Sequence, residues 1–140
     1  MTTTLLINID VDDLARAERF YGEAFGWRVA RRLGSSVAEL TGAAAPVYLL
    51  AKPAGSEASS SASTARDYRR HWTPLHLDIV VEDLDEALGR ATAAGATLEG
   101  EPRTLPWGRI AGLADPFGHG FCLLQFLGRG YDEVASGSGA

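Results

Sequence analysis

The sequence predicts an α+β fold made of two βαβββ modules within one structural domain. The first observation is an internal repeat, because aligning the chain with itself at an offset of 70 residues gives six identical pairs: Ile9/Ile79, Val11/Val81, Asp13/Asp83, Leu14/Leu84, Ala17/Ala87 and Ala24/Ala94. Two weakly similar halves usually form two similar supersecondary units that share a core. The second observation is that each copy begins with apolar alternation, followed by an acidic residue and a helical pattern.

A strand opens each copy. The alternating segments LLINIDV (5–11) and LHLDIVV (75–81) each predict a strand with one buried face. In the second copy, His76 and Asp78 fall on the face opposite the buried one, and Asn8 takes the corresponding place in the first copy. These three side chains either contact a ligand or form hydrogen bonds within the protein, since buried polar groups need partners.

A helix follows each of these strands. Asp12 or Asp13, and Glu82 or Asp83, stand where an N-cap belongs, because a short acceptor side chain satisfies the free amides of the first turn. Apolar residues then recur at helical spacing, as Leu14, Ala17, Tyr21 and Ala24 in the first copy and Leu84, Ala87, Ala91 and Ala94 in the second. We expect each helix to cover the Ile/Val face of its own strand.

Three further strands complete each module. They are predicted at 26–33, 35–40 and 46–52 in the first half and at 96–100, 108–114 and 120–126 in the second, with a DPFG turn at 115–118. The chain is then divided into a first module (1–52), a Ser/Ala-rich linker (53–72), a second module (73–127) and a C-terminal tail (128–140). Composition predicts a flexible connector at 53–65 and disorder in the final ASGSGA.

Bulk properties narrow the class of protein. The 140 residues, 46% of them hydrophobic, suffice for the core of one domain. No apolar run approaches the length of a membrane span, and Asp10 interrupts the start where a signal peptide needs a longer apolar stretch. The single cysteine, Cys122, excludes an internal disulfide and a multi-cysteine zinc site, and the net charge of −5 argues against nucleic acid. We expect a soluble, cytoplasmic protein with no membrane partner.

The segments DVDDLARAERFYGEAFGW, VVEDLDEALGRATAAGA and LADPFGHGFCLLQF resemble the vicinal oxygen chelate superfamily, which includes glyoxalases, bleomycin-resistance proteins and extradiol dioxygenases. The resemblance covers residues 5–126. It implies two curved mixed sheets that form a cleft, often completed by a second subunit. We therefore expect a homodimer that binds a small molecule in this cleft.

The resemblance also implies where a divalent metal ion would bind. The family's ligand positions correspond here to Leu6, Tyr48, His76 and Cys122. Leucine cannot coordinate a metal, and one imidazole plus one thiol supply two donors where an open catalytic site normally has three. We expect no cofactor. The alternative is a divalent metal bound by His76 with Glu39 or His71.

The predicted ligand-binding residues are those expected on the cleft side. His76 can orient a ligand or act as a general base, Trp107 and Arg109 share a face of a strand that borders the cleft in the family, and Trp72 could form a lid. In the alternative interpretation, Trp107 covers a sheet edge and Arg109 pairs with a surface acid. The full set is Asn8, Tyr48, Trp72, His76, Asp78, Trp107, Arg109 and Cys122.

Two residues near the last strand are expected to have no chemical role. Cys122 lies in an apolar segment and is predicted to act as a small hydrophobic residue rather than as a nucleophile. His119, in a GHG turn, is predicted to be exposed.

Two functions follow from this reasoning. The first is a metal-independent binding protein that encloses a flat or aromatic ligand by stacking and apolar burial. The alternative is a metal-dependent, glyoxalase-like lyase, isomerase or dioxygenase, in which the metal polarises the substrate. The sequence leaves open whether the protein is an enzyme, and the binding function is favoured because the metal ligands are incomplete.

Overall fold

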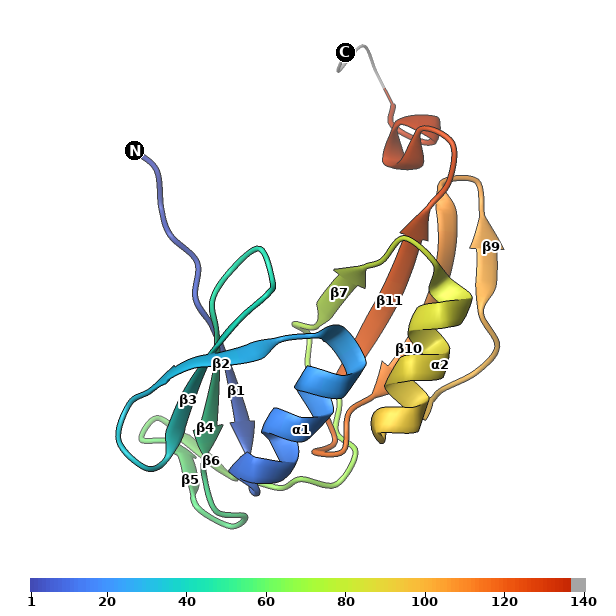
Figure 1. Ribbon diagram of the computed structural model, residues 1–140. Helices are drawn as coiled ribbons and strands as arrows, with labels where there is room; N and C mark the ends of the chain where they lie inside the picture. Colours follow the sequence, from blue (N-terminus) through green and yellow to red (C-terminus); the bar gives the residue numbers. More distant parts are fainter. Residues whose placement is uncertain (137–140) are drawn as a thin grey trace.

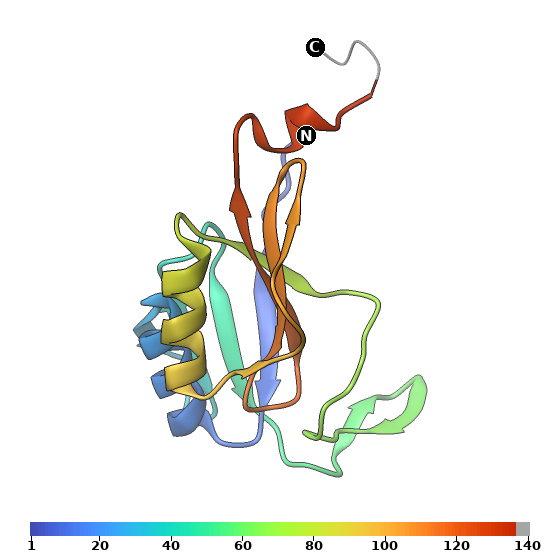
Figure 2. The ribbon, with the colours of Figure 1, turned by 90° about the vertical axis from the view of Figure 1, so that its right-hand side faces the viewer.

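The computed structural model describes residues 1–136 and confirms the α+β class, with two helices lying on one side of two separate curved sheets (Figures 1 and 2). The first sheet has the strand order β1-β4-β3-β2, and the second has the order β7-β11-β10-β8 with β9 added beside β10. In both sheets the first strand pairs in parallel with the last strand of its module, β1 with β4 and β7 with β11. The repeat seen in the sequence is therefore a repeat of topology.

The helices and strands follow one another along the chain in the order labelled in Figure 1. They are β1 (Ile7–Val11), α1 (Leu14–Phe25), β2 (Arg28–Arg32), β3 (Val37–Thr41), β4 (Val47–Ala51), β5 (Glu57–Ser59), β6 (Ala62–Ala65), β7 (Leu77–Val80), α2 (Leu84–Ala94), β8 (Thr97–Leu98), β9 (Arg103–Leu105), β10 (Gly108–Ala114), β11 (Gly120–Phe126) and a 3-10 helix, η1 (Gly130–Glu133). No helix within residues 1–136 is long and apolar enough to cross a membrane.

Each helix begins at one of the two acids that the sequence offered as caps. Asp13 accepts a hydrogen bond from the backbone N–H of Arg16 at 3.0 Å, and Asp83 accepts one from that of Glu86 at 3.1 Å. Both caps have extended backbone, which lets the carboxylate reach the free amides of the first turn. The helices thus start at equivalent positions of the two modules.

Aromatic side chains hold the two modules together. Phe25 of α1 in the first module meets Phe121 of β11 in the second edge-on at 5.7 Å, and within the first module Tyr21 stacks on Trp27 with ring centroids 5.4 Å apart. The Tyr21 hydroxyl donates a hydrogen bond of 2.5 Å to the buried carboxylate of Asp115, which lies in the turn before β11. This contact crosses from the first module to the second, so the core is shared.

One segment is more ordered than its composition predicts. In the linker, β5 and β6 form a hairpin, closed by backbone hydrogen bonds between Gly55 and Arg66 at 2.7 Å and between Arg66 and Ser56 at 2.8 Å. Small polar residues do not prevent such backbone pairing, so the prediction of a flexible connector was wrong here. In the tail, η1 places Tyr131 against Trp107. Residues 137–140 of the predicted disordered end lie outside the described part of the chain.

Candidate functional site

Three of the predicted residues meet on the side of the second sheet that faces away from the helices. Cys122 of β11 is the register partner of Asp78 in β7, and His76 lies just before β7. The potential ligand atoms of His76, Asp78 and Cys122 all lie within 4.8 Å of one another. The His76 Nε2 and Asp78 Oδ1 atoms are 3.0 Å apart, so the two side chains form an ion pair whenever the imidazole is protonated.

A cavity of about 190 Å³ adjoins this cluster. Its lining includes His76 and Cys122 together with Arg70, His71 and Trp72 of the linker. The Trp72 side chain is 80% exposed, so its ring is free to contact a bound molecule. Pockets for drug-sized ligands usually measure about 300–1,000 Å³. This cavity by itself is therefore smaller than a typical pocket for a drug-sized ligand.

The Cys122 thiol is held in its neutral form. Burial raises its pKa, and the nearby Asp78 carboxylate raises it further. The thiolate is both the nucleophile and the metal ligand, so a raised pKa works against both roles at neutral pH. That Cys122 acts as a small hydrophobic residue stays a prediction.

The family's metal-ligand positions do not form a complete set in this structure. Leu6 is exposed and has no donor atom. The Tyr48 hydroxyl donates to Glu39, which also accepts from Arg31 Nε at 2.8 Å. Hydrogen bonds from Arg31 and then Tyr48 lower the pKa of Glu39, and Glu39 in turn raises the pKa of Tyr48. Asp78 adds a third donor to His76 and Cys122 that the family's positions do not include. This set of one nitrogen, one oxygen and one sulfur donor is of the kind that binds zinc and is a poor match for metals that prefer oxygen ligands.

The predicted residues of the first module lie on a different sheet. Asn8 of β1 and Tyr48 of β4 are register partners, and Glu39 of β3 lies beside Tyr48. The cavity next to His76 is lined by linker and second-module residues. The structure therefore brings the first-module residues together with one another and does not bring them to His76 within one chain.

Trp107 and Arg109 lie elsewhere, which corrects the expectation that they face the cleft. Arg109 has the same parity as the core residue Ala111 and pairs with Asp85 of α2 at 3.1 Å. Trp107 packs against Tyr131 with ring centroids 5.0 Å apart. The register of β10 turns these residues towards α2 and the C-terminal segment, as in the alternative interpretation of a sheet-edge tryptophan and a surface ion pair.

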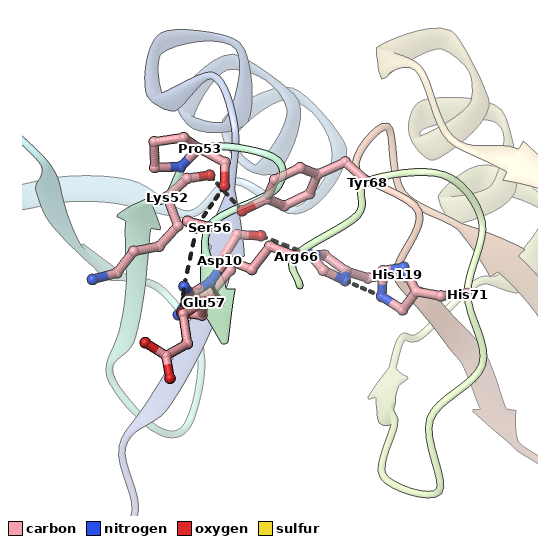
Figure 3. A network of polar contacts seen from close by, with 9 residues as sticks. All are labelled: Asp10, Lys52, Pro53, Ser56, Glu57, Arg66, Tyr68, His71 and His119. Atoms are coloured by element: carbon pink, nitrogen blue, oxygen red, sulfur yellow. Dashed lines mark hydrogen bonds and ion pairs between the residues drawn. The ribbon is translucent and has the colours of Figure 1, made fainter. Parts of the chain in front are cut away.

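His119, which was predicted to be exposed, is half-buried and hydrogen-bonded at both ring nitrogens (Figure 3). Its Nε2 lies 2.7 Å from the carbonyl oxygen of Asp10, and its Nδ1 lies 2.8 Å from Nε2 of His71. The glycines on either side of His119 are the sequence feature that could have predicted this contact. A Cβ at Gly118 would lie 2.3 Å from the carbonyl oxygen of Arg69, and one at Gly120 would lie 2.6 Å from the Arg70 guanidinium. The linker backbone leaves no room for a side chain at Gly118, whereas at Gly120 the Arg70 side chain would have to move.

A second cavity, of about 760 Å³, lies between the modules where the edge strands β1 and β7 face each other across a gap (Figure 1). Its lining is apolar at Ile7, Trp27 and Ile79 and acidic at Glu82 and Glu86. Leucine and valine side chains next to it are exposed to solvent, namely Leu5 (69%), Leu6 (52%) and Val80 (56%). The sequence did not predict this cavity, because it depends on how the two modules pack.

Comparison with solved structures shows where this fold occurs. The fosfomycin resistance protein FosX from Listeria monocytogenes is 20% identical over 96% of this chain and 99% of its own, with a TM-score of 0.70. A mutant of FosX has been solved with Mn(II) and 1S,2S-dihydroxypropylphosphonic acid. TnmS3, an antibiotic binding protein from Streptomyces sp. CB03234, is 24% identical over 91% of this chain and 98% of its own, with a TM-score of 0.62.

Comparison with curated sequences finds similarity over half of the chain. The anthracycline biosynthesis protein DnrV from Streptomyces peucetius is 40% identical over 70 residues, which are 50% of this chain and 24% of DnrV. The matched region thus spans about a quarter of that relative's length. The sequence profile of the glyoxalase-like domain matches residues 6–124, which include both modules. The chain therefore belongs to the glyoxalase-like domain family, within the vicinal oxygen chelate superfamily.

Proposed function

We propose that this protein binds a flat, polycyclic aromatic small molecule without a metal ion, on the open face of the second sheet. One observation carries the proposal: Trp72, Arg70 and His76 converge on one cavity. An exposed aromatic ring supplies stacking area, and a guanidinium and an imidazole can donate hydrogen bonds to carbonyl or phenolate oxygens. Flat aromatic compounds that bear oxygen atoms have this chemistry.

The similarity to other proteins supports this class of ligand. DnrV is named for anthracycline biosynthesis, and TnmS3 is described as an antibiotic binding protein. Anthracyclines are planar and carry several carbonyl and phenolic oxygens. A ligand of this kind would stack on Trp72 and accept hydrogen bonds from Arg70, which is half-exposed although it pairs with Glu99 at 2.7 Å.

The proposal includes a second copy of the chain. A cavity of about 190 Å³ is too small to enclose a polycyclic ligand. The exposed apolar residues at the strand edges, Leu5, Leu6 and Val80, are suited to contact a partner subunit. A two-fold homodimer could place the first sheet of one subunit opposite the second sheet of the other, with Asn8 and Tyr48 completing the cleft. Sedimentation measurements on the wild type and on Leu6→Asp test this, and a monomeric wild type would refute the dimer.

Ligand titration tests the binding site. Daunorubicin, a representative anthracycline, is titrated into the protein while its fluorescence quenching is followed. We expect Trp72→Ala to weaken binding at least about tenfold, which corresponds to the loss of roughly 1.4 kcal/mol of stacking and burial. Trp107→Phe serves as the matched control, because Trp107 packs against Tyr131 away from the cavity. Equal affinity of wild type and Trp72→Ala would overturn the proposed site.

The second candidate function is a metal-dependent lyase, isomerase or dioxygenase. The proximity of His76, Asp78 and Cys122 favours it, as does the Mn(II) bound in a FosX structure. The test is metal analysis by mass spectrometry of untagged protein after incubation with Fe²⁺, Mn²⁺, Ni²⁺ or Zn²⁺ and removal of free ions. Under our proposal, retention stays well below one ion per chain. Stoichiometric retention that His76→Ala abolishes would establish the metal-dependent alternative.

A further inference from the structure

The last part of the linker crosses from the first module to the second, and we refer to residues 66–72 as the strap. At its start, Arg66 pairs with the Asp10 carboxylate at 2.7 Å, and the Tyr68 hydroxyl donates to the carbonyl oxygen of Lys52 at 2.7 Å (Figure 3). At its end, the backbone N–H of His71 donates to the carbonyl oxygen of Gly118 at 3.1 Å. The strap therefore connects β1 of the first sheet to the turn that precedes β11.

The two histidines at this crossing form a chain of three hydrogen bonds, whose protons can be counted. The Nε2 atom of His119 lies 2.7 Å from the Asp10 carbonyl oxygen, and the Nδ1 atom of His71 lies 2.9 Å from the Arg69 carbonyl oxygen. A carbonyl oxygen only accepts, so both of these nitrogens must carry a proton. The remaining nitrogens, His71 Nε2 and His119 Nδ1, are 2.8 Å apart and need one proton between them.

The hydrogen bonds therefore require three protons on four ring nitrogens. Two neutral imidazoles carry only two. We propose that His71 and His119 hold one shared excess proton, and that this proton closes the strap over the ligand site. In this state one ring donates from both nitrogens and the other is neutral: either His71 is doubly protonated and His119 is the Nε2–H tautomer, or His119 is doubly protonated and His71 is the Nδ1–H tautomer. The pair then has a single positive charge.

Both other protonation states weaken the strap. If the shared proton is lost, one of the three bonds is always missing: two nitrogen lone pairs face each other, or the His71 Nδ1 lone pair faces the Arg69 carbonyl oxygen, or the His119 Nε2 lone pair faces the Asp10 carbonyl oxygen. If a second excess proton is added, two N–H groups face each other across 2.8 Å. The three bonds are complete only with one excess proton, so strap closure should pass through a maximum as pH is varied.

Charged groups of both signs surround the histidine pair. The groups next to the strap and the GHG turn include five carboxylates, Asp10, Asp12, Asp67, Glu99 and Asp115, and four basic side chains, Lys52, Arg66, Arg69 and Arg70. Hydrogen bonds from Arg69 hold the pKa of Asp67 at about 2, so this carboxylate stays ionised at neutral pH. The Tyr68 ring lies edge-on to His119 with centroids 6.3 Å apart. The five carboxylates and the four basic side chains together carry a net charge of −1, not counting the histidines.

The consequence for binding rests on the proposed function. His71 and Trp72 are adjacent in the strap, and both line the cavity beside His76. Loss of the His71–His119 bond would leave this end of the strap held by the His71 backbone N–H and by the Arg70–Glu99 pair, and would loosen the position of the adjacent Trp72. We expect daunorubicin affinity to fall at least about fivefold on the alkaline side of the maximum, in the lower range of reported coupling between linked sites.

The decisive experiment uses no ligand. Protein labelled with ¹⁵N-histidine is studied by long-range ¹H–¹⁵N correlation NMR from about pH 5 to 8, the range in which histidine side chains commonly change charge. Over part of this range, we expect His71 Nδ1 and His119 Nε2 to be protonated and one further proton to lie between His71 Nε2 and His119 Nδ1. His76, the third histidine, serves as the internal reference. Two neutral rings at every pH in which the protein is folded would overturn the inference.

Two variants are used, so that the test does not depend on a single substitution that could prevent folding. His119→Gln removes the ring that bridges to Asp10, and His71→Gln leaves that bridge in place. Either folded variant should abolish the maximum in a pH titration of Trp72 fluorescence, recorded in a Trp27→Phe/Trp107→Phe background. An unchanged maximum in a folded variant would contradict the proposal. The proposed ligand site and the proposed shared proton can be refuted independently. The NMR experiment needs no ligand, and Trp72-dependent binding could persist with two neutral histidines.

Discussion

The buried hydrogen bond between Tyr21 and Asp115 should be the polar contact whose loss affects stability most clearly. Tyr21 is 4% exposed and Asp115 is 5% exposed, and the hydroxyl and carboxylate oxygens are 2.5 Å apart. The other carboxylate oxygen, Oδ1, accepts from the backbone N–H groups of Phe117 and His119. Tyr21→Phe keeps the ring that stacks on Trp27 and removes only the donor to Oδ2. A buried oxygen of a charged group is then left without its partner.

The expected loss is about 1.5–3 kcal/mol in the free energy of unfolding, since hydrogen bonds to charged groups fall in this range. Each 1 kcal/mol lowers Tm by roughly 2–4 °C in a chain of this size. Urea unfolding followed by tryptophan fluorescence measures the difference. Tyr131→Phe is the matched control, because Tyr131 is 50% exposed and should change stability by less than about 0.5 kcal/mol. If Tyr21→Phe also loses less than about 0.5 kcal/mol, the reasoning is wrong.

The same residue gives a pH dependence with a definite sign. Burial, and then the charge of Asp115, raise the pKa of Tyr21 well above its ordinary value of 10.0. The phenol stays protonated in the folded state at pH values where it ionises in the unfolded chain. Its contribution to stability is therefore complete below pH 10 and decreases as pH rises from there towards the folded-state pKa. The stability difference between wild type and Tyr21→Phe should shrink over that range.

Three further predictions concern the strap and the site. Gly118→Ala should lose at least about 1–2 kcal/mol in urea unfolding, because Gly118 has φ of +84° and its Cβ would meet the Arg69 carbonyl; unchanged stability would contradict this. Cys122 should react with iodoacetamide more slowly at pH 7 than in the urea-unfolded chain, because burial raises its pKa; equal rates would refute this. Hydrogen bonding to Arg70 lowers the pKa of Glu99, so its stabilising effect should be complete above pH 4.5 and lost as pH falls through the folded-state pKa. Glu99→Gln should reduce this acid dependence in urea unfolding, and identical pH profiles would refute the role of Glu99.

Local sequence patterns predicted most of the fold, because their causes are local. The offset of 70 residues, the capping acids and the alternating strands all reappear as equivalent elements of two modules. Capping depends on a side chain three residues from the amide that it accepts, and alternation depends on the period of the strand. The linker hairpin was missed because its closure depends on backbone hydrogen bonds and on the Arg66–Asp10 pair, which composition does not encode.

The candidate site was predictable only in part. Parity along residues 75–81 was enough to place His76 and Asp78 on one face, because alternation decides which way a strand residue points, and the resemblance to the family added Cys122, which lies beside them. The resemblance to a family was not enough for Arg109, whose direction follows from the register of β10 against β11. A register is a long-range property, and a shift by one residue reverses the face.

The sequence by itself determined the two modules, their capped helices and the polar residues on the open face of β7. Only the tertiary structure decided what surrounds those residues. His71 and His119 are 48 residues apart, and they meet because the strap crosses the GHG turn between two glycines. Contacts of this kind depend on the packing of one module against the other, which no local pattern in the chain specifies.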